Sequence, residues 1–119
     1  MKKIIYILAL FSSPIYATQT YICDFSNYSN QKGNHKENFK LTFVLDKEAG
    51  KSYMIGNNGS NPVTHIDEGN GKSFIEITFS GNVMSTTIDS KMNAVHSRNS
   101  VGFTGELLPS QYYGLCAKK

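Results

Sequence analysis

Large apolar residues recur at every second position over much of this chain, and this alternation is what most restricts the folds open to it. Successive side chains of a β-strand point to opposite faces, so a period of two predicts strands with one buried face. The clearest case is the segment Asn38 to Leu45. Its apolar residues fall on one face, which we expect in the core: Phe39, Leu41, Phe43 and Leu45.

Two other segments show the same alternation. Thr20 to Phe25 is expected to bury Tyr21, Cys23 and Phe25. For Ser73 to Ser80 the alternation favours a buried face made of Ile75, Ile77 and Phe79, with an outer face made of Phe74, Glu76 and Thr78. Five shorter strands are predicted near residues 51–55, 63–67, 83–88, 94–101 and 111–116.

Clusters of Gly, Asn, Asp and Ser separate these segments at short intervals, as in Asn57-Asn58-Gly59-Ser60 and Ser80-Gly81-Asn82. Short links join antiparallel neighbours, so we expect an all-β, antiparallel meander of about eight short strands, forming a small barrel or a sandwich. The polar stretch from Tyr28 to Glu37 has no clear period and is expected to be a mobile loop. Residues 18–119 should form a single β domain.

The first seventeen residues differ in character from the rest. Lys2 and Lys3 precede the apolar run Ile4 to Phe11, and Ala17 supplies a small residue for cleavage. This order predicts a signal peptide over residues 1–17 and a secreted or periplasmic protein, because the run is too short to span a bilayer. Without the two lysines the net charge falls from +3 to +1. We therefore expect no nucleic-acid partner and no stable membrane insertion.

The chain contains two cysteines, Cys23 and Cys116, near the two ends of the expected mature domain. Exported proteins keep disulfides, so we predict that these residues form one bond that closes the domain. The alternative is a reactive or metal-bound thiol pair, which is usually marked by a CxxC or a His-flanked spacing that this sequence lacks.

No established catalytic motif is present in the sequence: GxSxG, HExxH, a P-loop and a dinucleotide-binding glycine fingerprint are all missing. The histidines His35, His65 and His96 lie in different segments, which does not favour a metal site. We therefore expect a protein that is not an enzyme and that has no metal or cofactor. The alternative is a small hydrolase that uses His96 or His65.

Two places are candidates for ligand or partner recognition. His96 and Arg98 lie two residues apart on one strand face, where they could present donors to an anionic or carbonyl-rich ligand. The alternative is a solvated strand face. Tyr112 and Tyr113 are adjacent in the last strand, so one should lie in the core and the other outside, where it could anchor a partner.

The segments Ala94-Val95-His96-Ser97-Arg98 and Gln111-Tyr112-Tyr113-Gly114-Leu115-Cys116, with the early Cys23, resemble those of small exported bacterial proteins of unknown function. That resemblance implies no activity. The segment Gly50-Lys51-Ser52-Tyr53 is similar to a loop of the periplasmic C-type lysozyme inhibitors, a family that also has an export signal, a small β-barrel and a disulfide. This second resemblance implies inhibition by a loop that inserts Ser52 or Lys51 into a sugar-binding cleft.

These observations predict a secreted or periplasmic binding or structural module without catalysis. Its partner would be another exported protein or a cell-envelope component. The sequence does not specify the ligand or the oligomeric state. Inhibition of a lysozyme-like, wall-degrading enzyme is the first alternative, and the small hydrolase is the second.

Overall fold

A computed structural model describes residues 18–57 and 59–119, and in this part of the chain it contains eight antiparallel strands. The predicted signal peptide lies outside these residues. No helix within them has the length and hydropathy needed to cross a membrane. The strands are β1 (Gln19–Asn30), β2 (Gly33–Asp46), β3 (Lys51–Gly56), β4 (Gly59–Asp67), β5 (Lys72–Ile77), β6 (Val83–Ile88), β7 (Asn93–Val101) and β8 (Leu107–Lys118).

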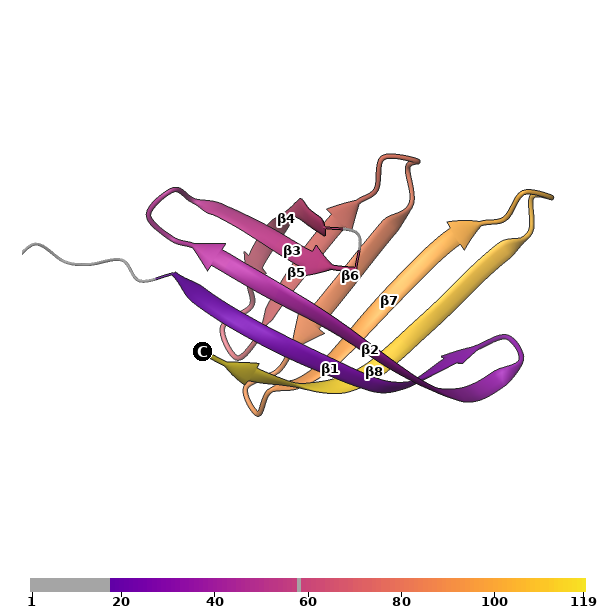
Figure 1. Ribbon diagram of the computed structural model, residues 1–119, viewed down its shortest axis with the longest axis horizontal. Coiled ribbons are helices and arrows are strands. Elements are labelled where there is room, and N and C mark those ends of the chain that lie inside the picture. The colour runs from indigo at the N-terminus through magenta and orange to yellow at the C-terminus, as the bar shows by residue number, and fades with distance from the viewer. Residues whose placement is uncertain (1–17, 58) are drawn as a thin grey trace, which may run out of the picture.

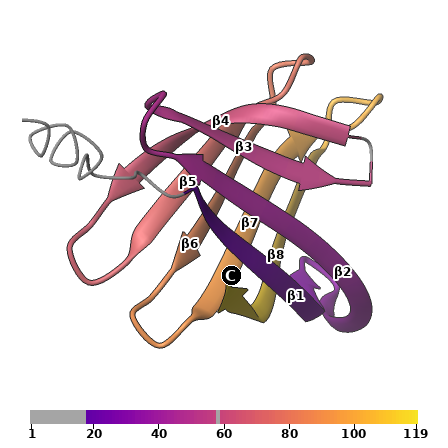
Figure 2. The same ribbon diagram turned by 60° about the vertical axis from the view of Figure 1, so that its left-hand side comes forward.

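Each strand pairs with the next along the chain, and β8 pairs with β1, so the sheet closes into a barrel (Figures 1 and 2). The prediction of an all-β meander is confirmed, and the architecture is a barrel rather than a sandwich. The β1–β2, β5–β6 and β7–β8 turns lie toward one end, at the right in Figure 1. We call this end the mouth of the barrel. The chain terminus after β8 lies at the other end.

The barrel closes along the seam between β1 and β8. Cys23 and Cys116 face each other in the register of these strands and form the predicted disulfide, with their Cα atoms 3.9 Å apart. Nearby, the backbone of Gly114 lies so close to Asp24 that a Cβ on residue 114 would be 2.1 Å from the Asp24 carbonyl oxygen. The seam therefore depends on a residue without a side chain as well as on the disulfide.

The barrel interior contains aromatic and aliphatic residues, and half of its buried apolar side chains come from β1 and β2. Leu41, Phe43 and Leu45 of β2 are buried and Phe39 is partly buried, as predicted. The predicted inner face of β1 is also confirmed, because Tyr21, Cys23 and Phe25 are all buried.

The predicted facing of β5 is wrong. Phe74 and Glu76 point inward and are buried, whereas Ile77 is 73% exposed and Phe79, beyond the end of the strand, is fully exposed. Phe74 is drawn inside by aromatic contacts, since its ring stacks on that of Phe43 with centroids 4.5 Å apart and lies 6.3 Å from that of Tyr21. A large ring shared by three strands fills more of the core than Ile75 or Ile77 could fill from the same position.

The prediction of a mobile loop from Tyr28 to Glu37 is also wrong. Residues 28–37 continue β1 and β2 as a paired hairpin with a tight turn, in which Gly33 adopts a φ of 109° that favours glycine. The ring of Tyr28 stacks between those of His35 and Tyr112, with both centroid distances 4.9 Å. These stacked rings order a segment whose composition alone is typical of a loop.

The disulfide prediction can be tested by thiol counting and unfolding. The denatured, unreduced protein should show no reactive thiol, and reduction should lower the free energy of unfolding by about 2–5 kcal/mol, because the bond closes a loop spanning almost the whole domain. A Cys23→Ala, Cys116→Ala double variant should be insensitive to reductant. Two titratable thiols in the wild-type protein would contradict the disulfide.

The facing of β5 can be tested with two phenylalanines of opposite exposure. Phe74→Ala should cost about 3–5 kcal/mol of unfolding free energy, since it empties a packed site. Phe79→Ala should change it by no more than about 0.5 kcal/mol. Chemical denaturation measures both. Equal losses would contradict the facing described here, and a larger loss for Phe79→Ala would mean that β5 faces the other way.

Candidate functional site

A cavity of about 520 Å³ opens at the mouth of the barrel, and residues of all six strands from β2 to β7 line it. Its volume falls in the range typical of small-molecule sites. We call it the mouth cavity. It is lined by charged and apolar side chains together, among them Glu37, Phe39, Met54, Glu76, Met84 and Arg98.

Arg98 of β7 is held in place from three sides. Its Nε donates a hydrogen bond to His96 Nε2 at 3.1 Å. Its guanidinium carbon lies 4.6 Å from the ring centre of Phe39 and 5.0 Å from that of Tyr112, so the cation rests against two aromatic rings. The two terminal nitrogens have no hydrogen-bond or ion-pair partner among the described residues. They remain available to a ligand in the mouth cavity.

His96 lies on the core side of Arg98, accepts its hydrogen bond and does not line the mouth cavity. Its side chain is 1% exposed. Nε2 accepts from Arg98, so the neutral ring carries its proton on Nδ1, which donates to Thr86 Oγ1 at 2.6 Å. Burial, and secondarily the positive charge of Arg98, lower the pKa of His96 to about 3. The ring is therefore neutral at physiological pH, and both of its nitrogens are engaged.

Tyr112 of β8 completes the wall behind Arg98. Its ring is buried and contacts the rings of Phe25, Tyr28 and Phe39. Burial raises the pKa of its hydroxyl, and the negative charge of the nearby Glu37 raises it further, while Arg98 acts in the opposite direction. Tyr112 is therefore a neutral, rigid platform for the guanidinium.

The structure brings together three of the four residues predicted to bind, namely His96, Arg98 and Tyr112. Tyr113 lies on the outer face, where it is exposed and its hydroxyl is 3.3 Å from Ser29 Oγ. The prediction that one of the two tyrosines is buried and the other exposed is thus confirmed. The alternative given for His96 and Arg98, a solvated strand face, does not hold for His96, which is fully inside the barrel.

Glu37 and Glu76 also line the site, and the sequence analysis does not include them among the candidate binding residues. Glu76 was expected on the outer face of its strand, and Glu37 in a loop. The only available signal was the placement of Glu76 between Ile75 and Ile77, since a charged residue within an apolar strand is either exposed or faces a functional interior.

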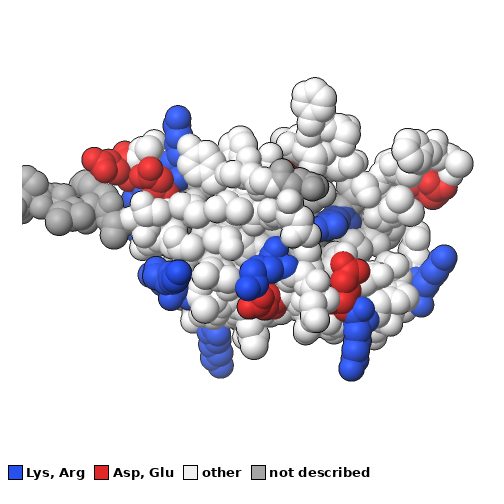
Figure 3. Space-filling view, viewed as in Figure 1, with Lys and Arg blue, Asp and Glu red and all other residues white. Residues whose placement is uncertain are grey.

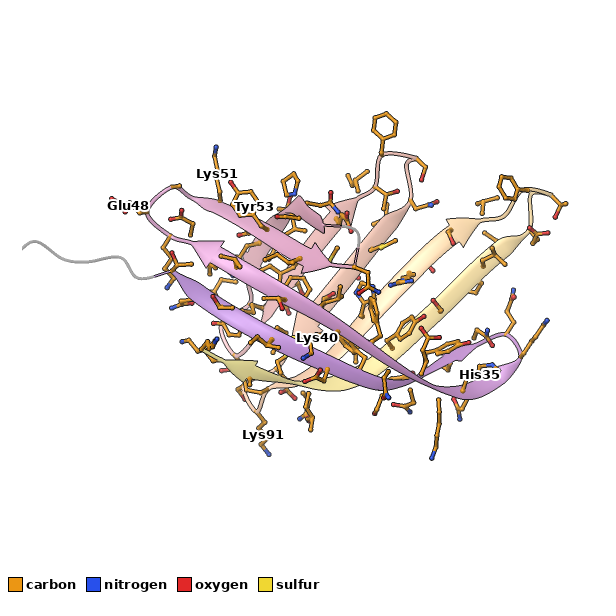
Figure 4. All side chains as sticks on the ribbon, viewed as in Figure 1. His35, Lys40, Glu48, Lys51, Tyr53 and Lys91 are labelled. Atoms are coloured by element: carbon orange, nitrogen blue, oxygen red, sulfur yellow. A yellow bond between two sulfur atoms is a disulfide. The ribbon has the colours of Figure 1, made fainter. Side chains whose placement is uncertain are left out.

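The other two histidines lie away from the mouth cavity lining. His65 of β4 contacts the ring of Phe74, with centroids 5.3 Å apart, and its Nε2 is buried without a hydrogen-bond partner among the described residues. Burial is the main cause that lowers its pKa. His35 Nε2 lies 3.0 Å from Asn30 Oδ1 within the β1–β2 hairpin, and Figure 4 places it near the tip of that hairpin.

A larger hollow, of about 770 Å³, lies between the β2–β3 turn and β4. Its lining includes Lys51 and Tyr53 of β3, both labelled in Figure 4. Ser52 also lines it but is buried with its side chain toward the barrel interior, so it cannot be inserted into the cleft of another protein. Of the two residues suggested by the resemblance to lysozyme inhibitors, only Lys51 is exposed.

Charges are mixed on the face seen in Figure 3, where basic and acidic side chains alternate without a single-sign field. The residues described by the structure contain no group of three or more His, Cys, Asp or Glu side chains that could hold a metal ion.

No protein-family model matches the chain, and neither a curated protein nor a solved structure is similar enough to count as a match.

The buried, neutral state of His96 predicts a pH dependence of stability. In the unfolded chain this ring takes up a proton below about pH 6.5, whereas in the barrel it stays neutral until about pH 3. The unfolded state therefore binds more protons in this window, and the stability present above pH 6.5 is lost as pH falls toward 3. The contribution of one group is at most about 1.4 kcal/mol per pH unit.

Urea denaturation of the wild type and of His96→Gln, measured between pH 7.5 and pH 5, tests this dependence. The variant should lose part of the wild-type slope of unfolding free energy against pH, whatever its absolute stability. The same slope in both proteins would mean that His96 takes up its proton in the folded state as readily as in the unfolded chain.

Proposed function

We propose that this chain is an exported, non-catalytic binding module that takes a small ligand with an anionic group into the mouth cavity, where Arg98 recognises the anion. The observation that carries the proposal is the fixed guanidinium, whose two terminal nitrogens lack a partner among the described residues. A planar guanidinium held in this way is suited to two parallel hydrogen bonds with a carboxylate or a phosphate.

Preorganisation strengthens this argument. A free arginine side chain loses rotamer freedom when it binds, and that loss reduces affinity. Here His96, Phe39 and Tyr112 already restrict Arg98 before a ligand arrives. His96 thus has a positioning role in the proposed recognition pair, and Arg98 makes the contact.

The absence of catalysis remains part of the proposal. A hydrolase that used His96 as a general base would need a ring nitrogen facing the substrate, but both nitrogens of His96 are engaged and its pKa lies near 3. Export is supported by the leader pattern in the sequence, and the Cys23–Cys116 disulfide is compatible with an oxidising compartment.

Titration with hexanoate, followed by amide chemical shifts in NMR spectra, tests the proposal. Shifts should change most at residues that line the mouth cavity. Arg98→Ala should weaken binding about tenfold or more, because it removes charged hydrogen bonds to the carboxylate. Arg98→Lys should restore little of the affinity. An ammonium group cannot donate two parallel hydrogen bonds to a carboxylate, and it has no planar surface to stack on Phe39 and Tyr112.

Lys40→Ala is the matched control. Lys40 lies on the outer side of β2, where it is exposed and pairs with Asp24 at 3.7 Å (Figure 4). Its removal deletes the same charge without touching the mouth cavity and should leave hexanoate binding unchanged. Equal loss in the Lys40 and Arg98 variants would show only general charge attraction and would contradict the proposal.

A further inference from the structure

A second charged group faces the same cavity and has no hydrogen-bond or ion-pair partner within residues 18–57 and 59–119. Glu76 of β5 is 7% exposed and lines the mouth cavity. No described residue forms a hydrogen bond or an ion pair with its carboxylate; the ion pair formed by the described residues is Lys40–Asp24. The residue as a whole is buried, but its carboxylate oxygens are not among the buried polar atoms that lack a partner in the described part of the chain, so they open onto the mouth cavity. There they can accept hydrogen bonds from a ligand.

The strand register places Glu76 in line with Arg98. Glu76 pairs with Met84 of β6, and Met84 pairs with Arg98 of β7. Neighbouring strands lie about 4.8 Å apart, so the Cα atoms of Glu76 and Arg98 are separated by about 10 Å. Both side chains point inward, with the apolar side chain of Met84 between them. The barrel therefore holds an anionic and a cationic group on the two strands that flank β6, both facing one cavity, with no ion pair between them among the described residues.

From this arrangement we infer that the ligand is a small zwitterion, whose anionic group binds Arg98 and whose ammonium group binds Glu76. The inference rests on the proposed function, in which Arg98 binds an anionic group, and it assigns the ligand a cationic group as well. An ammonium group offers three N–H donors, which is what an unpartnered carboxylate lacks. The apolar lining from Phe39, Met54 and Met84 strengthens both contacts, because the field of a charge is screened less beside apolar atoms than in water.

The charge balance of the cavity favours a zwitterion over a simple anion. Glu37, at the rim, adds a second carboxylate to Glu76, against the single guanidinium of Arg98. A ligand with only a negative charge would bind Arg98 against the repulsion of two carboxylates. A ligand that also carries an ammonium group replaces the repulsion from Glu76 with an attraction.

Three linear probes that differ only in their charged ends test the inference: hexanoate, hexylamine, and aminohexanoate with its amine at the far end of the chain. Aminohexanoate should bind about tenfold more tightly than hexanoate, as expected for a charged hydrogen-bonded contact. Glu76→Gln should abolish this preference by weakening aminohexanoate binding, while hexanoate binds at least as well as before. Arg98→Ala should weaken both carboxylates and leave hexylamine unaffected.

Glu76→Gln keeps the shape of the side chain, and thermal melting will show whether the variant is folded. Glu48→Gln is the matched control, because Glu48 is exposed in the β2–β3 turn, far from the mouth (Figure 4). It should leave the preference for aminohexanoate intact. A loss of preference in both variants would point to a general charge effect and would overturn the role of Glu76.

The outcomes separate this inference from the proposed function. If hexanoate binds as tightly as aminohexanoate and Arg98→Ala weakens both, the zwitterion is excluded and the anion site stands. If Arg98→Ala changes neither, or if neither carboxylate binds, the anion site fails and the inference fails with it.

Discussion

Closure of the barrel between β1 and β8 is the constraint on which the rest of the structure depends. Until the first and last strands pair, the inner faces of the eight strands do not enclose a common interior. Non-local pairing of this kind carries a large entropic cost, because the ends of the chain must meet. The disulfide between Cys23 and Cys116 lowers that cost in the unfolded chain, and Gly114 permits the close approach of the two backbones.

The barrel interior is lined by a buried, largely aromatic row of side chains and, nearer the mouth, by a row that carries charged groups. The strand register determines which residues belong to each row. One inward row runs through Phe74, Thr86, His96 and Tyr112, and it is buried. The next row toward the mouth contains Glu76, Met84 and Arg98. The buried row therefore supports the charged row directly, and His96 is the residue through which the aromatic core fixes the orientation of Arg98.

Sequence reasoning succeeded where one face of a strand is uniformly apolar. In β2 four apolar residues share a face, so a shift by one position would expose all of them, and the pattern alone determines the facing. The pairing of Cys23 with Cys116 was predictable for a similar reason, since the chain has two cysteines and no other partner for either. The same reasoning placed His96 and Arg98 on one face, but it could not show that this face points inward, because neither face of β7 is strongly apolar.

It failed in β5 and in the β1–β2 hairpin, and both failures concern residues at the mouth cavity. In β5 one face carries Ile75 and Ile77 and the other carries Phe74 and Glu76. Because a charged residue normally faces solvent, the pattern predicts that the face with Glu76 is the outer one. The barrel reverses that choice because Phe74 stacks on Phe43, and the period of two then carries Glu76 inside as well. A stable core contact thus forces a carboxylate into the interior. That position can persist because the cavity beside it admits a polar partner, and this is why an error in the pattern coincides with a candidate binding residue.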